Sequence, residues 1–160
     1  MTDRHTILPL QGVRAFAFLG IFLYHCGVFE TGPWAVQVFL ILSGFLMAYN
    51  YCDKMNGNYD FKFSMEFSIH KIKKLYPLHI TMMLIVILPS VKEMVLSHKL
   101  YILYFEQILA NLLLIQAWIP SNLFWYSLNG VAWYLSVVLF TYIVFPKLLC
   151  MMKKWILKNL

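Results

Sequence analysis

The sequence predicts an all-α fold, a polytopic transmembrane helix bundle with about four to five spans in one membrane domain over residues 1–160. Three observations predict this class. Hydrophobic residues make up 61% of the 160 residues and charged residues only 12%, which is typical of integral membrane proteins. Apolar stretches of roughly 20 residues, the length that a span needs, recur along the chain. Polar stretches that contain glycine, proline or lysine separate them.

The first predicted span, Leu10–Phe29, contains Arg14 and His25. A charged group at the bilayer centre costs about 3 kcal/mol, so ionisable residues within a span are functional candidates. Because each helical residue turns by about 100°, both side chains leave one face of the helix, about 16 Å apart along its axis. Two other roles stay open: an arginine near the membrane surface that extends into the headgroups, and a histidine that only packs.

The second predicted span is Trp34–Tyr51, which follows a turn at Glu30–Pro33. After it, Phe61–Ile69 alternates apolar and polar residues, a pattern that by itself is typical of a strand. Because a lone strand between membrane spans has no backbone partner, we expect an interfacial segment that becomes helical toward Lys71.

Three further apolar segments complete the chain: Leu78–Val91, Leu100–Trp118 and Val131–Leu149, with a polar loop at Lys92–Lys99 between the first two. The excess of lysine and arginine on cytoplasmic loops predicts a cytoplasmic N-terminus. Three crossings after the basic cluster would leave the C-terminal lysines outside. Two alternatives stay open: one of the last three segments does not span, with the short Leu78–Val91 as the first candidate, or these lysines are an exception to the rule.

The charge distribution and the cysteines argue against a nucleic-acid-binding protein, a cysteine metal site and a disulfide framework. The net charge is +6, but the cations lie beside apolar spans, so contact with anionic lipid headgroups explains them better than nucleic acid does. The three cysteines form no CxxC pair, so neither a metal site nor a disulfide framework is expected.

Four short motifs resemble those of acyltransferase family 3, integral-membrane enzymes that acylate sugars and other cell-envelope hydroxyls. They follow the family order over nearly the whole chain: Arg14 with His25, Leu40–Leu46 around Ser43-Gly44, Lys71-Ile-Lys-Lys74-Leu-Tyr76-Pro77, and Asn129–Ser136 followed by Tyr142–Pro146. Family members usually have arginines in the third motif, where this chain has lysines. Many members have an acidic residue in the fourth motif, where this chain has Val131-Ala132-Trp133. Lysine attracts phosphate as a point charge but lacks the bidentate geometry of arginine.

The resemblance implies an acyl-CoA donor, typically acetyl-CoA, a carbohydrate or other hydroxyl acceptor, and no metal. It implies that His25 is catalytic, either as the base toward the acceptor hydroxyl or by taking the acyl group itself. We favour the base, because imidazole as a class has a pKa near neutrality and an alcohol scarcely attacks without a base. It also implies that Arg14 binds the donor phosphates, with Lys71, Lys73 and Lys74 adding attraction, although those lysines equally suit a cytoplasmic membrane anchor.

Further residues are candidates for lining the same cavity: Ser43, Gly44, Trp133 and Ser136. Close helix packing is an alternative role for Ser43-Gly44, because small residues let membrane helices approach. Trp133 and Ser136 also suit packing.

The resemblance places the protein in a bacterial-type plasma (inner) membrane. Because members of the family are longer, the chain resembles their N-terminal half. Whether it works alone or together with a C-terminal half or partner chain stays open. A catalytically inactive membrane fragment is the main alternative. A small transporter would also explain buried polar groups, but it does not predict these motifs.

Overall fold

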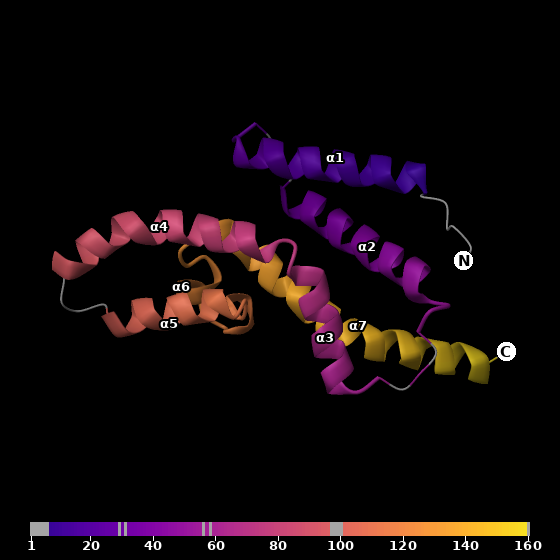
Figure 1. Cartoon of the computed structure of the whole chain (residues 1–160). Helices are drawn as coiled ribbons and strands as arrows, with labels where there is room; N and C mark the ends of the chain where they lie inside the picture. The colour runs from indigo at the N-terminus through magenta and orange to yellow at the C-terminus, as the bar shows by residue number, and fades with distance from the viewer. Residues whose placement is uncertain are drawn as a thin grey trace. The chain divides into compact units, whose positions relative to one another are not determined.

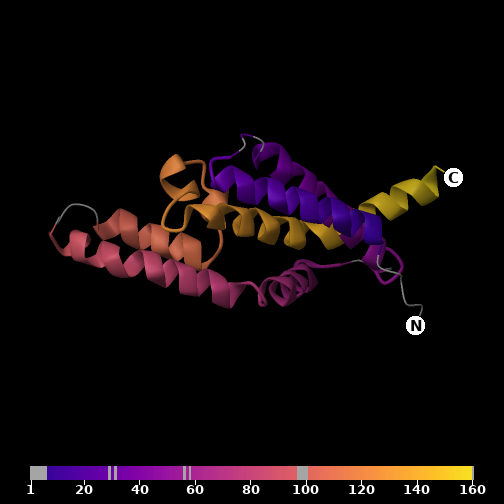
Figure 2. The same ribbon diagram turned by 90° about the horizontal axis from the view of Figure 1, so that it is seen from above.

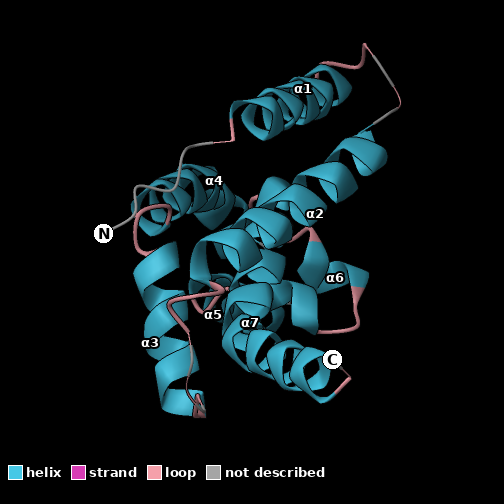
Figure 3. Cartoon of the chain, turned by 90° about the vertical axis from the view of Figure 1, so that its right-hand side faces the viewer, coloured by secondary structure: helices cyan, strands magenta, loops and turns pink. Residues whose placement is uncertain are grey.

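The computed structural model describes residues 7–28, 30, 32–55, 57, 59–96 and 101–159. Every regular element in these ranges is a helix (Figure 3), which confirms the predicted all-α class. The chain divides into two compact units, Met1–Gly57 and Asn58–Leu160. The prediction of one membrane domain stays a prediction.

The first unit is a hairpin of two antiparallel helices, α1 (Leu8–His25) and α2 (Gly32–Tyr51) (Figure 1). The helix α1 ends four residues before the predicted Phe29, because Gly27 adopts a left-handed conformation with φ of 71°. The Val28 amide then donates to the Leu23 carbonyl, which is the hydrogen bond of a glycine-terminated helix end.

Small residues let the two helices of this hairpin approach closely. Ala17 is buried, and a Cβ added at Gly20 would lie 3.2 Å from the Cβ of Ala35. The ring of Tyr24 covers Gly32 so closely that any side chain there would collide with it. The close contacts of α1 with α2 therefore involve Gly20 and Gly32. Apart from its chain neighbours and the adjacent backbone of α2, no described residue has an atom within 4 Å of a Cβ added at Gly44.

The second unit begins with α3 (Phe61–Ile72), the segment whose alternating pattern resembles a strand. The Asp60 carboxylate accepts a 2.9 Å hydrogen bond from the Phe63 amide, so the segment begins with a helix N-cap. It is helical from Phe61, earlier than expected from the sequence. Ser64, Ser68 and Ile72 recur every four residues and are buried, which identifies the face of α3 that packs.

This face lies against α7 (Trp133–Lys158), the long C-terminal helix. On the border of the contact, the ring of Phe67 stacks on Phe145 with 6.0 Å between centroids and meets the edge of Tyr142 at 6.4 Å. The two buried serines allow the helices to approach, and the aromatic rings fill the space beside them.

The chain bends by 67° between α3 and α4 (Tyr76–Leu96). The bend lies at residues 73–75, inside the basic motif. The helix α4 then runs antiparallel to α5 (Tyr101–Leu112), and both views show them side by side (Figures 1 and 2).

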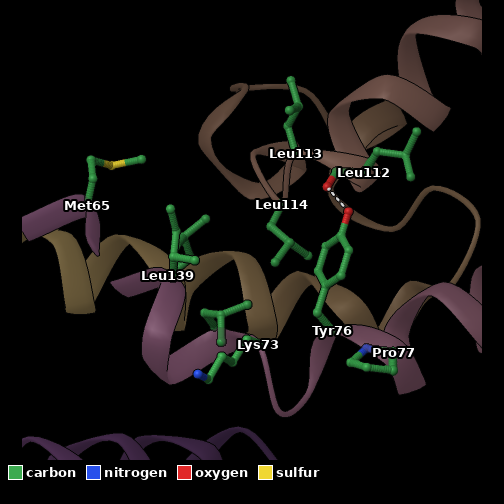
Figure 4. A pocket seen from close by; sticks show the side chains of 10 residues that line it. Met65, Lys73, Tyr76, Pro77, Leu112, Leu113, Leu114 and Leu139 are labelled. Atoms are coloured by element: carbon green, nitrogen blue, oxygen red, sulfur yellow. Dashed lines mark hydrogen bonds between the residues drawn. The ribbon is translucent and has the colours of Figure 1, made fainter. Parts of the chain in front are cut away.

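Side chains from the first turn of α4 satisfy the last carbonyls of α5. The Tyr76 hydroxyl donates to the Leu112 carbonyl at 2.9 Å (Figure 4), and His79 Nε2 donates to the Asn111 carbonyl at 3.0 Å. The last carbonyls of a helix have no partner within the helix, so these bonds fix the start of α4 to the end of α5.

The prediction of one span over Leu100–Trp118 is wrong, because α5 ends at Leu112. Leu114 has φ of 55°, and the Ile115 amide donates to the Ala110 carbonyl, which reverses the chain as a glycine would. A helix of 12 residues is about 18 Å long and does not cross a bilayer core of about 30 Å.

Three short helices connect α5 to α7: η1 (Gln116–Trp118), α6 (Asn122–Trp125) and η2 (Gly130–Ala132). Ser136 of α7 joins them to the long helix. Its hydroxyl accepts a hydrogen bond from the Ala117 amide at 3.2 Å, and its carbonyl accepts one from the Trp118 indole at 3.1 Å.

By length and composition, two of the described helical segments can cross a membrane, Gly32–Tyr51 and Gly130–Lys158, or up to three if α3 and α4 form one bent span. The predicted four to five spans exceed this number. Arg14 and His25 reduce the hydropathy of α1, and α5 is too short. The last apolar segment that can cross a membrane, Gly130–Lys158, is longer than the predicted Val131–Leu149.

Some sequence predictions concern residues outside the described ranges. They include most of the polar tail Met1–Pro9, Thr31 in the first turn, and Ser97–Lys99 in the expected polar loop.

Replacement of Ser68 by leucine tests the packing of α3 on α7. Ser68 is 0% exposed, and the larger side chain has no room, so we expect a loss of about 1–3 kcal/mol in the free energy of unfolding. The matched control is Ser68→Ala, which keeps the small volume. Thermal unfolding of the detergent-solubilised chain measures the stability of both variants. Equal melting temperatures of Ser68→Leu and Ser68→Ala would contradict the close packing of α3 on α7.

Replacement of Tyr76 by phenylalanine tests the bond between α4 and α5. The change leaves the Leu112 carbonyl without its donor, and we expect a loss of about 1 kcal/mol in the same assay. Tyr126 is an exposed tyrosine of the same unit, so Tyr126→Phe is the control. If Tyr76→Phe and Tyr126→Phe have the same melting temperature, the Tyr76 hydroxyl does not stabilise the unit.

Candidate functional site

Arg14 contacts α2 through an aromatic ring. Its guanidinium carbon lies 4.9 Å from the centroid of the Phe39 ring, within the range of a cation–π interaction. Ser43, one turn further along α2, donates its hydroxyl proton to the Phe39 carbonyl at 2.7 Å. Arg14 and Ser43 therefore contact different parts of Phe39, the arginine its ring and the serine its carbonyl, and Arg14 is half-buried.

His25 is the last residue of α1 and is exposed. Its Nδ1 lies 2.8 Å from the carbonyl of Ile21, one turn earlier. Because a carbonyl oxygen only accepts, Nδ1 carries the proton of this bond. In the neutral ring, Nε2 then has a free lone pair, so the backbone of α1 favours the tautomer with the proton on Nδ1.

Arg14 is half-buried and His25 is exposed, although both lie at one edge of the face of α1 that contacts α2. The middle of that face is formed by Ala17, Gly20 and Tyr24. By helix geometry these three lie about 60–120° around the axis from Arg14, and His25 lies about 20° in the opposite direction. The long arginine side chain reaches back to Phe39, and the shorter histidine does not reach α2.

The lysines of the basic motif belong to the second unit and differ in their surroundings. Lys71 is half-buried, and its ammonium lies 5.4 Å from the centroid of the Phe67 ring on the same helix. Lys73 and Lys74 are exposed at the bend between α3 and α4. Two cations at the bend are therefore open to solvent or to an anionic ligand.

Trp133 and Ser136 lie at the start of α7. Ser136 is 0% exposed, and its hydroxyl and carbonyl both bind η1. Trp133 is half-buried and meets the neighbouring ring of Tyr134 edge-on at 6.2 Å. Within the second unit, Ser136 therefore connects η1 to α7, whereas Trp133 packs on its neighbour Tyr134.

Sequence reasoning missed a group of buried polar residues in the second unit: His79, Asn111, Gln116 and Ser127. The Asn111 amide donates to the Ser127 hydroxyl at 2.8 Å, and the Gln116 amide donates to the Ala132 carbonyl at 3.1 Å. Among the described residues, the oxygens Asn111 Oδ1 and Gln116 Oε1 have no hydrogen-bond partner. The available signal was the presence of polar residues inside apolar segments, the same signal that identified Arg14 and His25.

Comparisons with known proteins agree with the order of the motifs. Residues 8–160 match the model of acyltransferase family 3, described as an acyltransferase domain. The chain is 30% identical over 165 residues to the acyltransferase MdmB of Streptomyces mycarofaciens, and the alignment covers 91% of this chain and 40% of that protein. The chain thus spans well under half the length of this curated relative. No solved structure matches it significantly.

The match covers both units and all four motifs, from the start of α1 to the end of the chain. It agrees with the apolar helices, two or three of which are able to cross a membrane. The chain is therefore an integral membrane protein that belongs to acyltransferase family 3.

Proposed function

We propose that this chain takes part in acyl transfer within the membrane, from an acyl-CoA donor to a hydroxyl acceptor, with His25 as the base. The observation that carries the proposal is the bond from His25 Nδ1 to the Ile21 carbonyl, which in the neutral form of this exposed ring places the lone pair on Nε2. An alcohol scarcely attacks a thioester near neutral pH without such a base.

In the proposed reaction, Nε2 removes the proton of the acceptor hydroxyl as its oxygen attacks the thioester carbonyl. The new C–O bond forms and the C–S bond breaks. The imidazolium of His25 then returns the proton to the departing thiolate, so the histidine ends the cycle neutral. This direct transfer needs one base and no covalent acyl-enzyme.

Arg14 is proposed to bind the phosphates of the donor. It lies about three turns from His25 on one helix, so a donor with its phosphates at Arg14 extends along α1 toward the base. The ring of Phe39 supports the guanidinium from one side, and its planar donors suit phosphate oxygens. Lys71 and Lys74 are proposed to add long-range attraction.

The remaining parts of the proposal rest on the family. The donor is proposed to be acetyl-CoA and the acceptor a carbohydrate of the cell envelope. The location is proposed to be a bacterial-type inner membrane with the N-terminus in the cytoplasm, which agrees with the positive-inside rule. The donor would then approach from the end of α1 where Arg14 lies.

A second candidate is a catalytically inactive fragment or subunit that acts only with a partner chain. The observation that favours it is the alignment, which covers 40% of the acyltransferase relative. The two candidates differ in whether membranes that contain only this chain transfer an acyl group.

The test of His25 uses membranes that contain the chain, radiolabelled acetyl-CoA and endogenous acceptors. We expect incorporation above chain-free membranes, reduced at least about 100-fold by His25→Gln, the typical contribution of a general base. The control is His70→Gln, at another exposed histidine. Equal incorporation by His25→Gln and the unaltered chain would overturn the catalytic role. No incorporation by the unaltered chain would favour the inactive fragment.

The test of Arg14 measures the dependence of incorporation on donor concentration. We expect Arg14→Ala to raise the apparent KM for acetyl-CoA roughly tenfold or more, because a hydrogen bond to a charged group contributes about 1.5–3 kcal/mol. Lys62→Ala, at an exposed cation of α3, is the control. An unchanged KM in Arg14→Ala would remove the arginine from the donor site.

A further inference from the structure

The second unit contains an apolar cavity beneath the bend between α3 and α4. Its volume is about 360 Å³, within the range of about 300–1,000 Å³ that is common for small-molecule sites. The end of α3, the start of α4, the turn after α5 and one residue of α7 form its walls (Figure 4). Eight of the ten lining residues are apolar: Met65, Ile69, Ile72, Pro77, Leu112, Leu113, Leu114 and Leu139.

One charged side chain, Lys73, lines this cavity. It lies at the bend and is exposed, so its ammonium is accessible from outside the wall. The other polar lining residue is Tyr76, whose hydroxyl donates to the Leu112 carbonyl. The tyrosine therefore presents its ring to the cavity, and the lysine supplies the charge.

This combination selects the chemistry of the occupant. A sugar or nucleotide needs several polar partners, which a cavity with eight apolar lining residues does not provide. A small anion would contact Lys73 but leave the cavity unfilled. An apolar chain attached to an anionic group satisfies both features. In a membrane protein, the abundant molecules of this kind are acidic phospholipids, and basic pockets between membrane helices bind their headgroups.

We propose that this cavity binds one acyl chain of an acidic membrane phospholipid, with the lipid phosphate at Lys73. All lining residues of this cavity belong to the second unit, whereas the proposed base and donor-binding arginine belong to the first. Lipid in this cavity contacts α3, α4, α5 and α7 together, so it stabilises the bend.

The test uses the full chain purified in a neutral detergent and phosphatidylglycerol with a photoreactive acyl chain. We expect crosslinks at the cavity residues, and weaker labelling by phosphatidylcholine with the same chains. We expect Lys73→Gln to weaken phosphatidylglycerol binding roughly fivefold, the effect of one lysine near an acidic lipid surface. The matched control is Lys74→Gln, an exposed lysine outside the lining, which should bind normally.

A second pair of variants tests the cavity itself. Leu139→Trp fills it from α7, and Leu113→Trp fills it from the turn if the first variant does not fold. We expect either to abolish crosslinking, whereas Leu148→Trp, at an exposed position of α7, should leave it unchanged. Circular dichroism and size-exclusion chromatography identify the folded variants.

Three results would overturn the proposal. Equal losses in Lys73→Gln and Lys74→Gln would indicate only general attraction to the basic surface. Undiminished crosslinking in a folded cavity-filling variant would place the chain elsewhere. Displacement by palmitoyl-CoA at lower concentrations than by unlabelled phosphatidylglycerol would assign the cavity to an acyl donor. Because none of these measurements involves acyl transfer, they are independent of the proposed function.

Discussion

The structure of the second unit depends on one constraint: a backbone group within an apolar protein needs a hydrogen-bond partner from the protein itself. The helix α5 ends after 12 residues, where its last carbonyls have no partner within the helix. Tyr76 and His79 of α4 donate to two of them, and Ser136 of α7 accepts from the amide of Ala117 just beyond. These bonds allow non-helical chain to follow a short helix.

The long helices were predictable from the sequence because length and hydropathy alone define them. The segment α3 was harder, since the strand pattern assumes that apolar residues are buried. Here Phe61 is 73% exposed and Ser68 is 0% exposed, because a close contact with α7 requires small side chains. The end of α5 was not predictable, because the left-handed residue is Leu114 and the sequence has no glycine there.

The candidate site was also predictable only in part, because helix periodicity places residues on a face but does not show what they contact. Helix periodicity placed Arg14 and His25 on one side of α1, and both lie at one edge of the contact with α2. The difference in their exposure depends on the contact of the long Arg14 side chain with Phe39, and the tautomer of His25 depends on its bond to Ile21. Neither follows from spacing. The buried role of His79 was missed because its partner, Asn111, is 32 residues away.

Leu114 combines two functions that most proteins assign to different residues. It reverses the chain in a conformation that costs a side chain of this type about 1–2 kcal/mol. It is also only 2% exposed and forms part of the cavity wall. A glycine would relieve the backbone but open the wall, whereas a larger residue would narrow the cavity without easing the turn. The path of the main chain and the shape of the cavity therefore cannot evolve independently at this position.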